Sequence, residues 1–138
     1  MPMDCPIFIK TSLMTENEIG TLVLNAAIKV HRSLGPGLLE SSYQECLYYE
    51  LKKSGLVVEK EKALPLVYQE VKLDIGYRID LLVENKVVIE IKAVENIMDV
   101  HLAQVLTYLK LSQSKLGYLL NFNVPLMKSG IKRVVNNL

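Results

Sequence analysis

The sequence predicts an α/β domain in which a central mixed β-sheet is flanked by α-helices. Three observations lead to this fold class. Residues from about 15 to 53 have the pattern of two helices, residues 56–94 change to alternating β-branched and aromatic residues, and a further helical segment followed by strands comes near the C-terminus. In chain order the expected elements are helices at about 15–34 and 38–53, three or four strands between 56 and 94, a helix at about 100–113, a strand at 117–122 and an edge strand at 131–135.

A capping box marks the start of the first helix. Thr15 and Glu18 have the spacing at which each side chain accepts the main-chain N–H of the other residue. Apolar residues then recur at helical spacing, at Ile19, Leu22, Val23, Ala26 and Val30. The segment Gly35-Pro36-Gly37 ends this helix, because proline disfavours the helical conformation in the residue before it. The second helix follows, with Gly55 beyond its end as a stop.

The strand region has turn signals at Pro65, at Gly76 and at 84–86. Beyond this region, Asp99 is expected to cap the third helix. An apolar stripe on that helix consists of Leu102, Val105, Leu106 and Leu109. The largely apolar segment at 117–122 is expected to form a buried strand.

Composition fits one globular domain over 1–138, with residues 1–14 as an N-terminal extension, because 50% of the residues are hydrophobic and 22% are charged. A nucleic-acid coat protein would be far more basic than the net charge of +1, although a local patch or a bound cation can supply a positive field. Cys5 and Cys46 belong to no metal or disulfide motif. We find no signal peptide and no membrane span, so we expect a cytoplasmic protein without membrane contact.

The predicted hairpin around Asn85 carries the most informative pattern. A three-residue loop centred on Asn85 pairs Val83 with Val87 and Leu81 with Ile89. The same register places Asp80 directly opposite Glu90. Two carboxylates repel by roughly 4 kcal/mol at a separation of about 4 Å and an effective dielectric of about 20, whereas surface charge pairs contribute at most about 1 kcal/mol. A purely structural hairpin would not favour such a pair.

Strand alternation puts Lys92 on the same face as Glu90. The Glu-x-Lys pattern alone is uninformative, since it also occurs at 50–52 and 70–72. Two interpretations remain open: an exposed sheet face with a Glu–Lys pair, or a site in which Asp80 and Glu90 hold Mg²⁺ or Mn²⁺. In the second, Lys92 orients or deprotonates an attacking water, which suits the hydrolysis of phosphodiester bonds. A loop shifted by one residue would turn Asp80 to the opposite face.

Asp80 followed one strand later by Glu90-x-Lys92 resembles the signature of the PD-(D/E)xK nuclease superfamily, although Ile79 stands where that name has proline. A second motif, Gly37-x-x-Glu40-x-x-Tyr43, is similar to that of the small GxxExxY family, which is assigned to the same superfamily. The resemblance covers nearly the whole chain, from about residue 17 to residue 122.

The resemblance implies a PD-(D/E)xK nuclease-like core and roles for individual residues. Asp80 and Glu90 are then metal ligands, with the main-chain carbonyl of Ile91 as a third. Glu40 is a further carboxylate that reaches the metal site from the second helix; without the resemblance it is an acid favoured by the helix dipole in a first turn. Tyr43 follows on the same helical face and is expected to pack there, with its hydroxyl touching the site.

On the third helix, His101, Gln104 and Tyr108 fall within an arc of about 60° beside the apolar stripe. Gln104-x-x-x-Tyr108 resembles the QxxxY element of the exonuclease branch of the superfamily, which implies that both residues position the substrate strand. As a pattern alone, polar residues beside an apolar stripe are the ordinary half-exposed edge of a helix. His101 is expected at that edge, with contact to substrate as the alternative.

The expected function is metal-dependent hydrolysis of nucleic-acid phosphodiester bonds, with DNA as the favoured substrate and Mg²⁺ or Mn²⁺ as the cofactor. The alternative is a binding or assembly module that keeps the nuclease core without turnover, which the near-neutral charge favours. The competent residue types at all four charged site positions favour the enzyme. The sequence leaves open DNA versus RNA, exonuclease versus endonuclease action, and whether the chain forms a homodimer.

Overall fold

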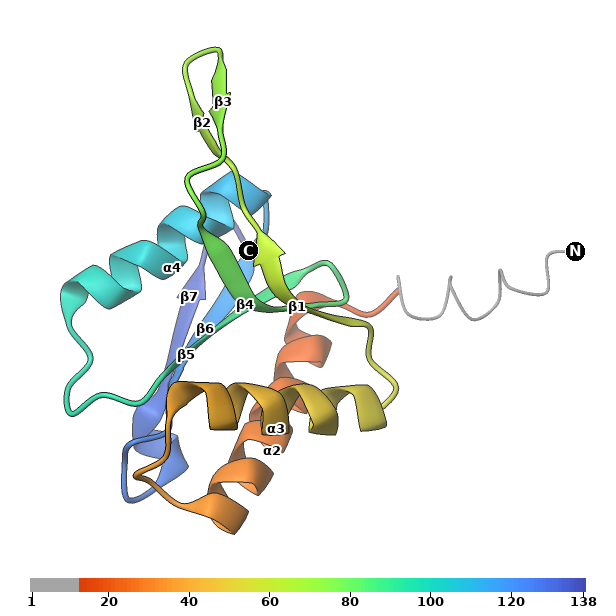
Figure 1. Cartoon of the computed structure of the whole chain (residues 1–138). Helices are drawn as coiled ribbons and strands as arrows, with labels where there is room; N and C mark the ends of the chain where they lie inside the picture. Colours follow the sequence, from red (N-terminus) through yellow and green to blue (C-terminus); the bar gives the residue numbers. More distant parts are fainter. Residues whose placement is uncertain (1–12) are drawn as a thin grey trace, which may run out of the picture.

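The computed structural model describes residues 13–138, which form a mixed five-stranded sheet with helices packed against it (Figure 1). The predicted fold class is therefore confirmed. The elements are α2 (Glu16–Leu34), α3 (Glu40–Lys53), β1 (Val58–Ala63), β2 (Leu66–Tyr68), β3 (Val71–Leu73), β4 (Arg78–Val83), β5 (Val87–Lys92), α4 (Asp99–Ser112), β6 (Leu116–Asn121), η1 (Met127–Gly130) and β7 (Ile131–Val135). All but the last two residues of the expected N-terminal extension, Cys5 included, lie outside the described residues. Within the described part, no helix is long and apolar enough to cross a membrane.

The sheet has the strand order β1-β4-β5-β6-β7. Strands β5 and β6 are parallel, and the other neighbouring pairs are antiparallel. A parallel pair needs a long crossover connection, which α4 supplies between β5 and β6. The strands β2 and β3 form a separate hairpin that projects from the sheet between β1 and β4 (Figure 1).

Two hydrophobic layers hold the helices on the sheet. Helices α2 and α3 pack on one face, against a cluster that includes Ile89 and Ile91 of β5 and Phe122 after β6. Helix α4 packs on the other face, where Val88 and Leu109 are fully buried. Burying one such aliphatic side chain contributes about 1.5–3 kcal/mol. Because β5 has apolar neighbours on both faces, its last residues are held rigidly at the centre of the molecule.

Helix starts agree with the sequence in one case and differ in two. Thr15 caps α2 as predicted, its hydroxyl accepting the Glu18 N–H at 3.1 Å. Helix α3 begins at Glu40, two residues later than expected. The prediction that Asp99 caps α4 was wrong, because Asp99 is already helical and His101 does the capping: the Met98 N–H donates to His101 Nδ1 at 3.0 Å.

The region between 56 and 94 contains five strands, where the sequence indicated three or four. The difference is the short hairpin β2–β3, whose turn includes Gln69 in the left-handed conformation at φ 54°. Apolar residues of this hairpin are largely exposed, among them Val67, Tyr68 and Val71. In the sequence, these apolar residues alternate with polar ones as in a half-buried strand. In the described structure no helix or strand packs on them, so the sequence pattern could not reveal that the hairpin projects.

Tyr43 braces the loop between α2 and α3. Its ring is fully buried and stacks on Phe122, with ring centroids 4.5 Å apart. The hydroxyl donates to the Gly35 carbonyl at 2.6 Å and accepts the Leu38 N–H at 3.1 Å. A buried ring with both hydroxyl partners inside the chain leaves no surface for substrate, so the expected contact of Tyr43 with the site is not made. Tyr43 instead fixes the loop that delivers Glu40.

The Tyr43→Phe substitution should lower the free energy of unfolding by about 1–2 kcal/mol, because it removes both hydroxyl bonds and leaves the stacked ring in place. Urea unfolding measures this directly. Tyr49→Phe is the matched control, since the Tyr49 side chain is exposed and should tolerate the change. Equal stability of the two variants would contradict a bracing role for the Tyr43 hydroxyl.

Candidate functional site

Strands β4 and β5 separate at the end where the site residues lie. The predicted pairs Val83–Val87 and Leu81–Ile89 are confirmed by the register. The ladder ends at Leu81–Ile89, so the expected direct pair of Asp80 with Glu90 is not formed. The prediction extended a regular register by one residue too many.

Asp80 and Glu90 instead bond across the gap to the main chain of the opposite strand. The Asp80 N–H donates to Glu90 Oε2 at 2.9 Å, and the Ile91 N–H donates to Asp80 Oδ2 at 2.8 Å. Each carboxylate oxygen takes the place of a main-chain carbonyl as acceptor. The two acids are therefore held close together, as the sequence predicted. The hydrogen bonds to the main chain that hold them were not predicted.

The regular side-chain alternation of β4 breaks at the same place. Ile79 and Leu82 both pack in the α4 layer, although residues three apart on a regular strand face opposite sides. Across from Asp80, Glu61 of β1 has the left-handed conformation, with φ 55°. Such a conformation costs a residue other than glycine about 1 kcal/mol or more. Both strands beside the site thus depart from regular geometry.

Burial raises the pKa of both carboxyl groups. The Glu90 side chain is only 5% exposed, and burial, followed by the nearby Asp80 carboxylate, raises its pKa to about 8. Burial also raises the pKa of Asp80, to about 6, while the bond from the Ile91 N–H works in the opposite direction. The carboxylate of Glu61 raises the pKa of both acids, and the ammonium of Lys92 lowers it.

Glu40 reaches the end of β5 from the first position of α3. Its Oε2 accepts the Ala93 N–H at 3.1 Å, and its charge raises the pKa of Asp80. The expected cluster of three carboxylate ligands is nevertheless not formed: within residues 13–138, no three His, Cys, Asp or Glu side chains are grouped to hold a metal ion. This result does not test Glu40 by itself, so the metal-ligand role expected for it stays a prediction. Its contact is with the main chain that leaves β5.

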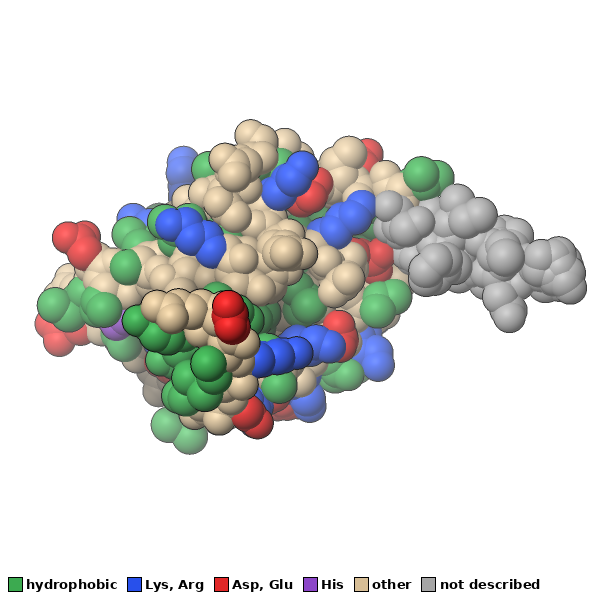
Figure 2. Space-filling view, turned by 90° about the horizontal axis from the view of Figure 1, so that it is seen from above, with side chains coloured by type: hydrophobic (Ala, Val, Ile, Leu, Met, Phe, Trp, Pro, Cys, Tyr) green, Lys and Arg blue, Asp and Glu red, His purple; other side chains and the backbone are tan. Residues whose placement is uncertain are grey.

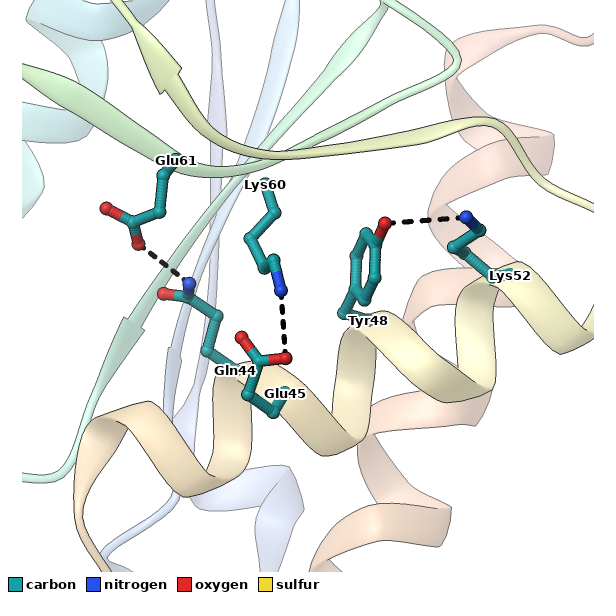
Figure 3. A network of polar contacts seen from close by, with 6 residues as sticks. All are labelled: Gln44, Glu45, Tyr48, Lys52, Lys60 and Glu61. Atoms are coloured by element: carbon teal, nitrogen blue, oxygen red, sulfur yellow. Dashed lines mark hydrogen bonds and ion pairs between the residues drawn. The ribbon is translucent and has the colours of Figure 1, made fainter.

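Glu61 is a residue near the site that sequence reasoning missed. Figure 3 shows it beside α3, where Gln44 Nε2 donates to Glu61 Oε2 at 2.7 Å. The neighbouring Lys60 bonds Glu45 of the same helix at 3.0 Å. The alternating charges of β1 are typical of a solvated strand, and this hid the one acid that lies near Asp80 and Glu90. The unusual φ of Glu61 has no sequence signal, since glycine or asparagine would be expected there.

Lys92 is the last residue of β5 and is half-buried. Among residues 13–138, its ammonium makes no hydrogen bond or ion pair. Its register partner is the buried Asn121 at the end of β6. Asn121 bonds both main-chain groups of Val94, accepting its N–H at 3.1 Å and donating to its carbonyl at 2.9 Å. The chain beyond Lys92 is thereby fixed while the ammonium stays available.

Gln104 and Tyr108 lie on α4 beside the acids. Gln104 Nε2 donates to the Tyr108 hydroxyl at 3.1 Å. Burial raises the pKa of Tyr108, and the carboxylates of Glu90 and Asp80 raise it further. The structure thus brings this pair to the site, whereas His101 is half-exposed one turn earlier, with Nδ1 bonded to the helix start.

Comparison with known families agrees with this arrangement. The family model of the PD-(D/E)XK nuclease superfamily matches residues 17–134. The chain belongs to the PD-(D/E)XK nuclease superfamily. Comparisons with curated proteins and with solved structures gave no match. Proteins of this superfamily are typically nucleases that cleave phosphodiester bonds, and they generally use divalent metal ions such as Mg²⁺.

The donor set of this superfamily member fits such an ion. Mg²⁺ is usually held by one or two carboxylates, keeps several waters and takes further oxygens from substrate phosphates. Asp80 and Glu90 supply two adjacent carboxylates, each with only one oxygen described as accepting a main-chain N–H. Three clustered ligands are not required for this coordination. The absence of a third carboxylate from the described cluster is therefore compatible with Mg²⁺.

In EDTA, the protein should lose stability as the pH rises from about 4 to about 8. Both acids have raised pKa values in the folded state, so the folded protein holds more protons than the unfolded chain over this range. Thermal and urea unfolding at several pH values measure the slope. Glu90→Gln keeps an acceptor oxygen without the charge, so it should reduce the slope and stabilise the protein at pH 8.

Parallel slopes for wild type and Glu90→Gln would contradict this prediction. Glu70→Gln on the exposed hairpin is the control, and it should leave the slope unchanged.

Proposed function

We propose that this protein is a metal-dependent nuclease that hydrolyses phosphodiester bonds of nucleic acid, with DNA as its substrate. The observation that carries the proposal is the pair of buried acids at the opening between β4 and β5, each accepting a main-chain N–H of the opposite strand, with the ammonium of Lys92 two residues beyond Glu90. Placing two acids and a lysine there is costly, because burial opposes their charges. A structural hairpin gains nothing from this arrangement, whereas a hydrolytic site does.

Asp80 and Glu90 would hold the metal ion, with the main-chain carbonyl of Ile91 as a third donor. When bound, the ion lowers the pKa of a water, polarises the phosphate and stabilises the charge that develops in the reaction. The ion also offsets the repulsion between the two acids, which burial has made unfavourable in its absence. In this assignment the weak acidity of Glu90 is the stability cost of a cation site.

Lys92 is assigned to the attacking water. Its ammonium is free to donate a hydrogen bond that orients the water, or to exchange a proton with it. Asn121 and Glu40 are positioning residues, since both bond the main chain just after Lys92. They hold the lysine and the acids in one arrangement.

Within the superfamily, we assign the chain to the GxxExxY group. Each motif residue has a task that supports this assignment. Gly37 has φ 102°, which favours glycine, Glu40 bonds the end of β5, and Tyr43 closes the intervening loop. The motif therefore joins α3 to the carboxylate pair.

Mg²⁺ or Mn²⁺ should raise the melting temperature of the wild type, because an ion that binds only the folded state stabilises it by mass action. At 100 times the dissociation constant this amounts to about 2.7 kcal/mol. Asp80→Asn should abolish most of the rise, while Asp74→Asn on the exposed hairpin should keep it. Differential scanning fluorimetry with each cation makes the comparison. Equal shifts in wild type and Asp80→Asn would place the ion elsewhere.

Lys92→Ala should lower the cleavage rate by about 10²- to 10⁴-fold, the usual contribution of a positioned acid or base. The cation-induced rise in melting temperature should survive, because both acids remain. The control is Lys115→Ala: the parallel register puts Lys115 next to the start of β6, at the end of the sheet opposite to Lys92. Gel assays with single- and double-stranded DNA and RNA, in Mg²⁺, Mn²⁺ or EDTA, give the rates.

Equal cleavage by wild type and Lys92→Ala would show that the activity comes from a contaminant or another site. If the wild type binds nucleic acid but cleaves none with any cation, the protein is a binding module on a nuclease core.

A further inference from the structure

A groove of about 420 Å³ lies beside the carboxylate pair, between α4 and the base of the projecting hairpin. Helix α4 contributes His101, Ala103, Gln104 and Tyr108, and the other wall includes Tyr77, the residue before β4. The rings of Tyr77 and Tyr108 meet edge to face, with centroids 6.2 Å apart. We call this space the α4 groove.

The α4 groove opens next to the reaction site. Tyr108 lines the groove, and the carboxylates of both Glu90 and Asp80 raise the pKa of its hydroxyl. Gln104 also lines the groove and bonds that hydroxyl. A nucleotide with its phosphate at the carboxylate pair therefore has the groove as its immediate neighbour.

The walls of the groove are poorly suited to neutralising the phosphate backbone. Among the described residues that line the groove, none is a lysine or arginine, and these two residue types supply the charge that neutralises phosphates. The walls are mainly apolar and aromatic, with amide, imidazole and hydroxyl groups among them. His101 adds a donor, since a neutral ring that accepts on Nδ1 carries its proton on Nε2.

A flat group with apolar faces and a hydrogen-bonding edge matches these walls, and a nucleobase is such a group. Unpaired bases are bound in this way, by stacking on aromatic side chains and by bonds to their edges. The surface around the groove is not uniformly positive. Viewed from above, hydrophobic side chains gather where the hairpin projects, and positive and negative side chains are interspersed around them (Figure 2).

We propose that the α4 groove binds one unpaired nucleobase next to the phosphodiester that is cleaved. This inference rests on the proposed nuclease function and adds the substrate class, because the bases of an intact duplex are stacked and paired and cannot enter a groove. The substrate is then a single strand.

An abasic scan tests the proposal. A series of single-stranded DNAs, each lacking one base at a different distance from the cleaved bond, is cleaved by wild type in Mn²⁺. One position next to that bond should show a loss in kcat/KM of about 5- to 150-fold, the value of one stacked base. A fully paired DNA hairpin of the same sequence should be cleaved more slowly than the intact single strand.

Filling the groove should remove this sensitivity. Ala103→Leu places a larger side chain in the groove and keeps good helix propensity. It should lower kcat/KM on the intact strand and leave no further loss at the abasic position. Thr21→Leu is the control, because Thr21 is also an exposed helical residue but lies on α2, away from the groove. Thermal unfolding verifies that both variants fold.

A second measurement is independent of turnover. Lys92→Ala in Mn²⁺ is titrated with single strands that carry the fluorescent base 2-aminopurine at the sensitive position. Its emission should be quenched on binding, and Ala103→Leu on the same background should abolish the quenching. Quenching without cleavage by the wild type would support the groove and overturn the nuclease function. Cleavage with equal rates across the abasic series, or cleavage without quenching, would overturn only the proposal that the groove binds a base. Failure to bind any single strand would overturn both this proposal and the nuclease function.

Discussion

Two carboxylates replace main-chain acceptors between β4 and β5, and the rest of the site depends on this exchange. Asp80 and Glu90 can approach each other only because each accepts an N–H from the opposite strand. Burial of the two acids at this opening raises the pKa of both, while the N–H bonds that they accept lower it. A site that is unfavourable when empty gains the most from a cation, because binding then removes a cost in addition to forming new bonds.

The surrounding structure holds this opening from several sides. Tyr43 fixes the loop before α3, so that the Glu40 carboxylate meets Ala93, and Asn121 of β6 bonds Val94 on the same stretch of chain. Hydrophobic layers cover both faces of β5, with Ile89 and Ile91 in one layer and Val88 in the other. Rigid strands and a braced loop position reacting groups more accurately than a flexible loop would.

Sequence patterns could predict the elements that follow a period and the residues that carry a motif. The loop at Asn85 and the pair Leu81–Ile89 followed from turn signals and alternation. The end of the ladder at Leu81–Ile89 could not be predicted. A side chain that replaces a main-chain acceptor leaves the alternation of residue types unchanged. Glu61 was hidden for a related reason, since its left-handed φ and its bond to Gln44 are tertiary properties in a strand of alternating charges.

The hairpin β2–β3 is an insertion in an otherwise continuous antiparallel pair. Strands β1 and β4 keep one register along their length, and the Leu64 N–H still donates to the Tyr77 carbonyl where the hairpin begins and ends. A tight turn could join the two strands at this point without moving Asp80. The hairpin is therefore modular: evolution or a designer can exchange residues 65–76 for another loop, while the sheet and the acids persist. Because Leu66 lines one wall of the α4 groove, such exchanges alter what lies beside the acids and leave the acids themselves in place.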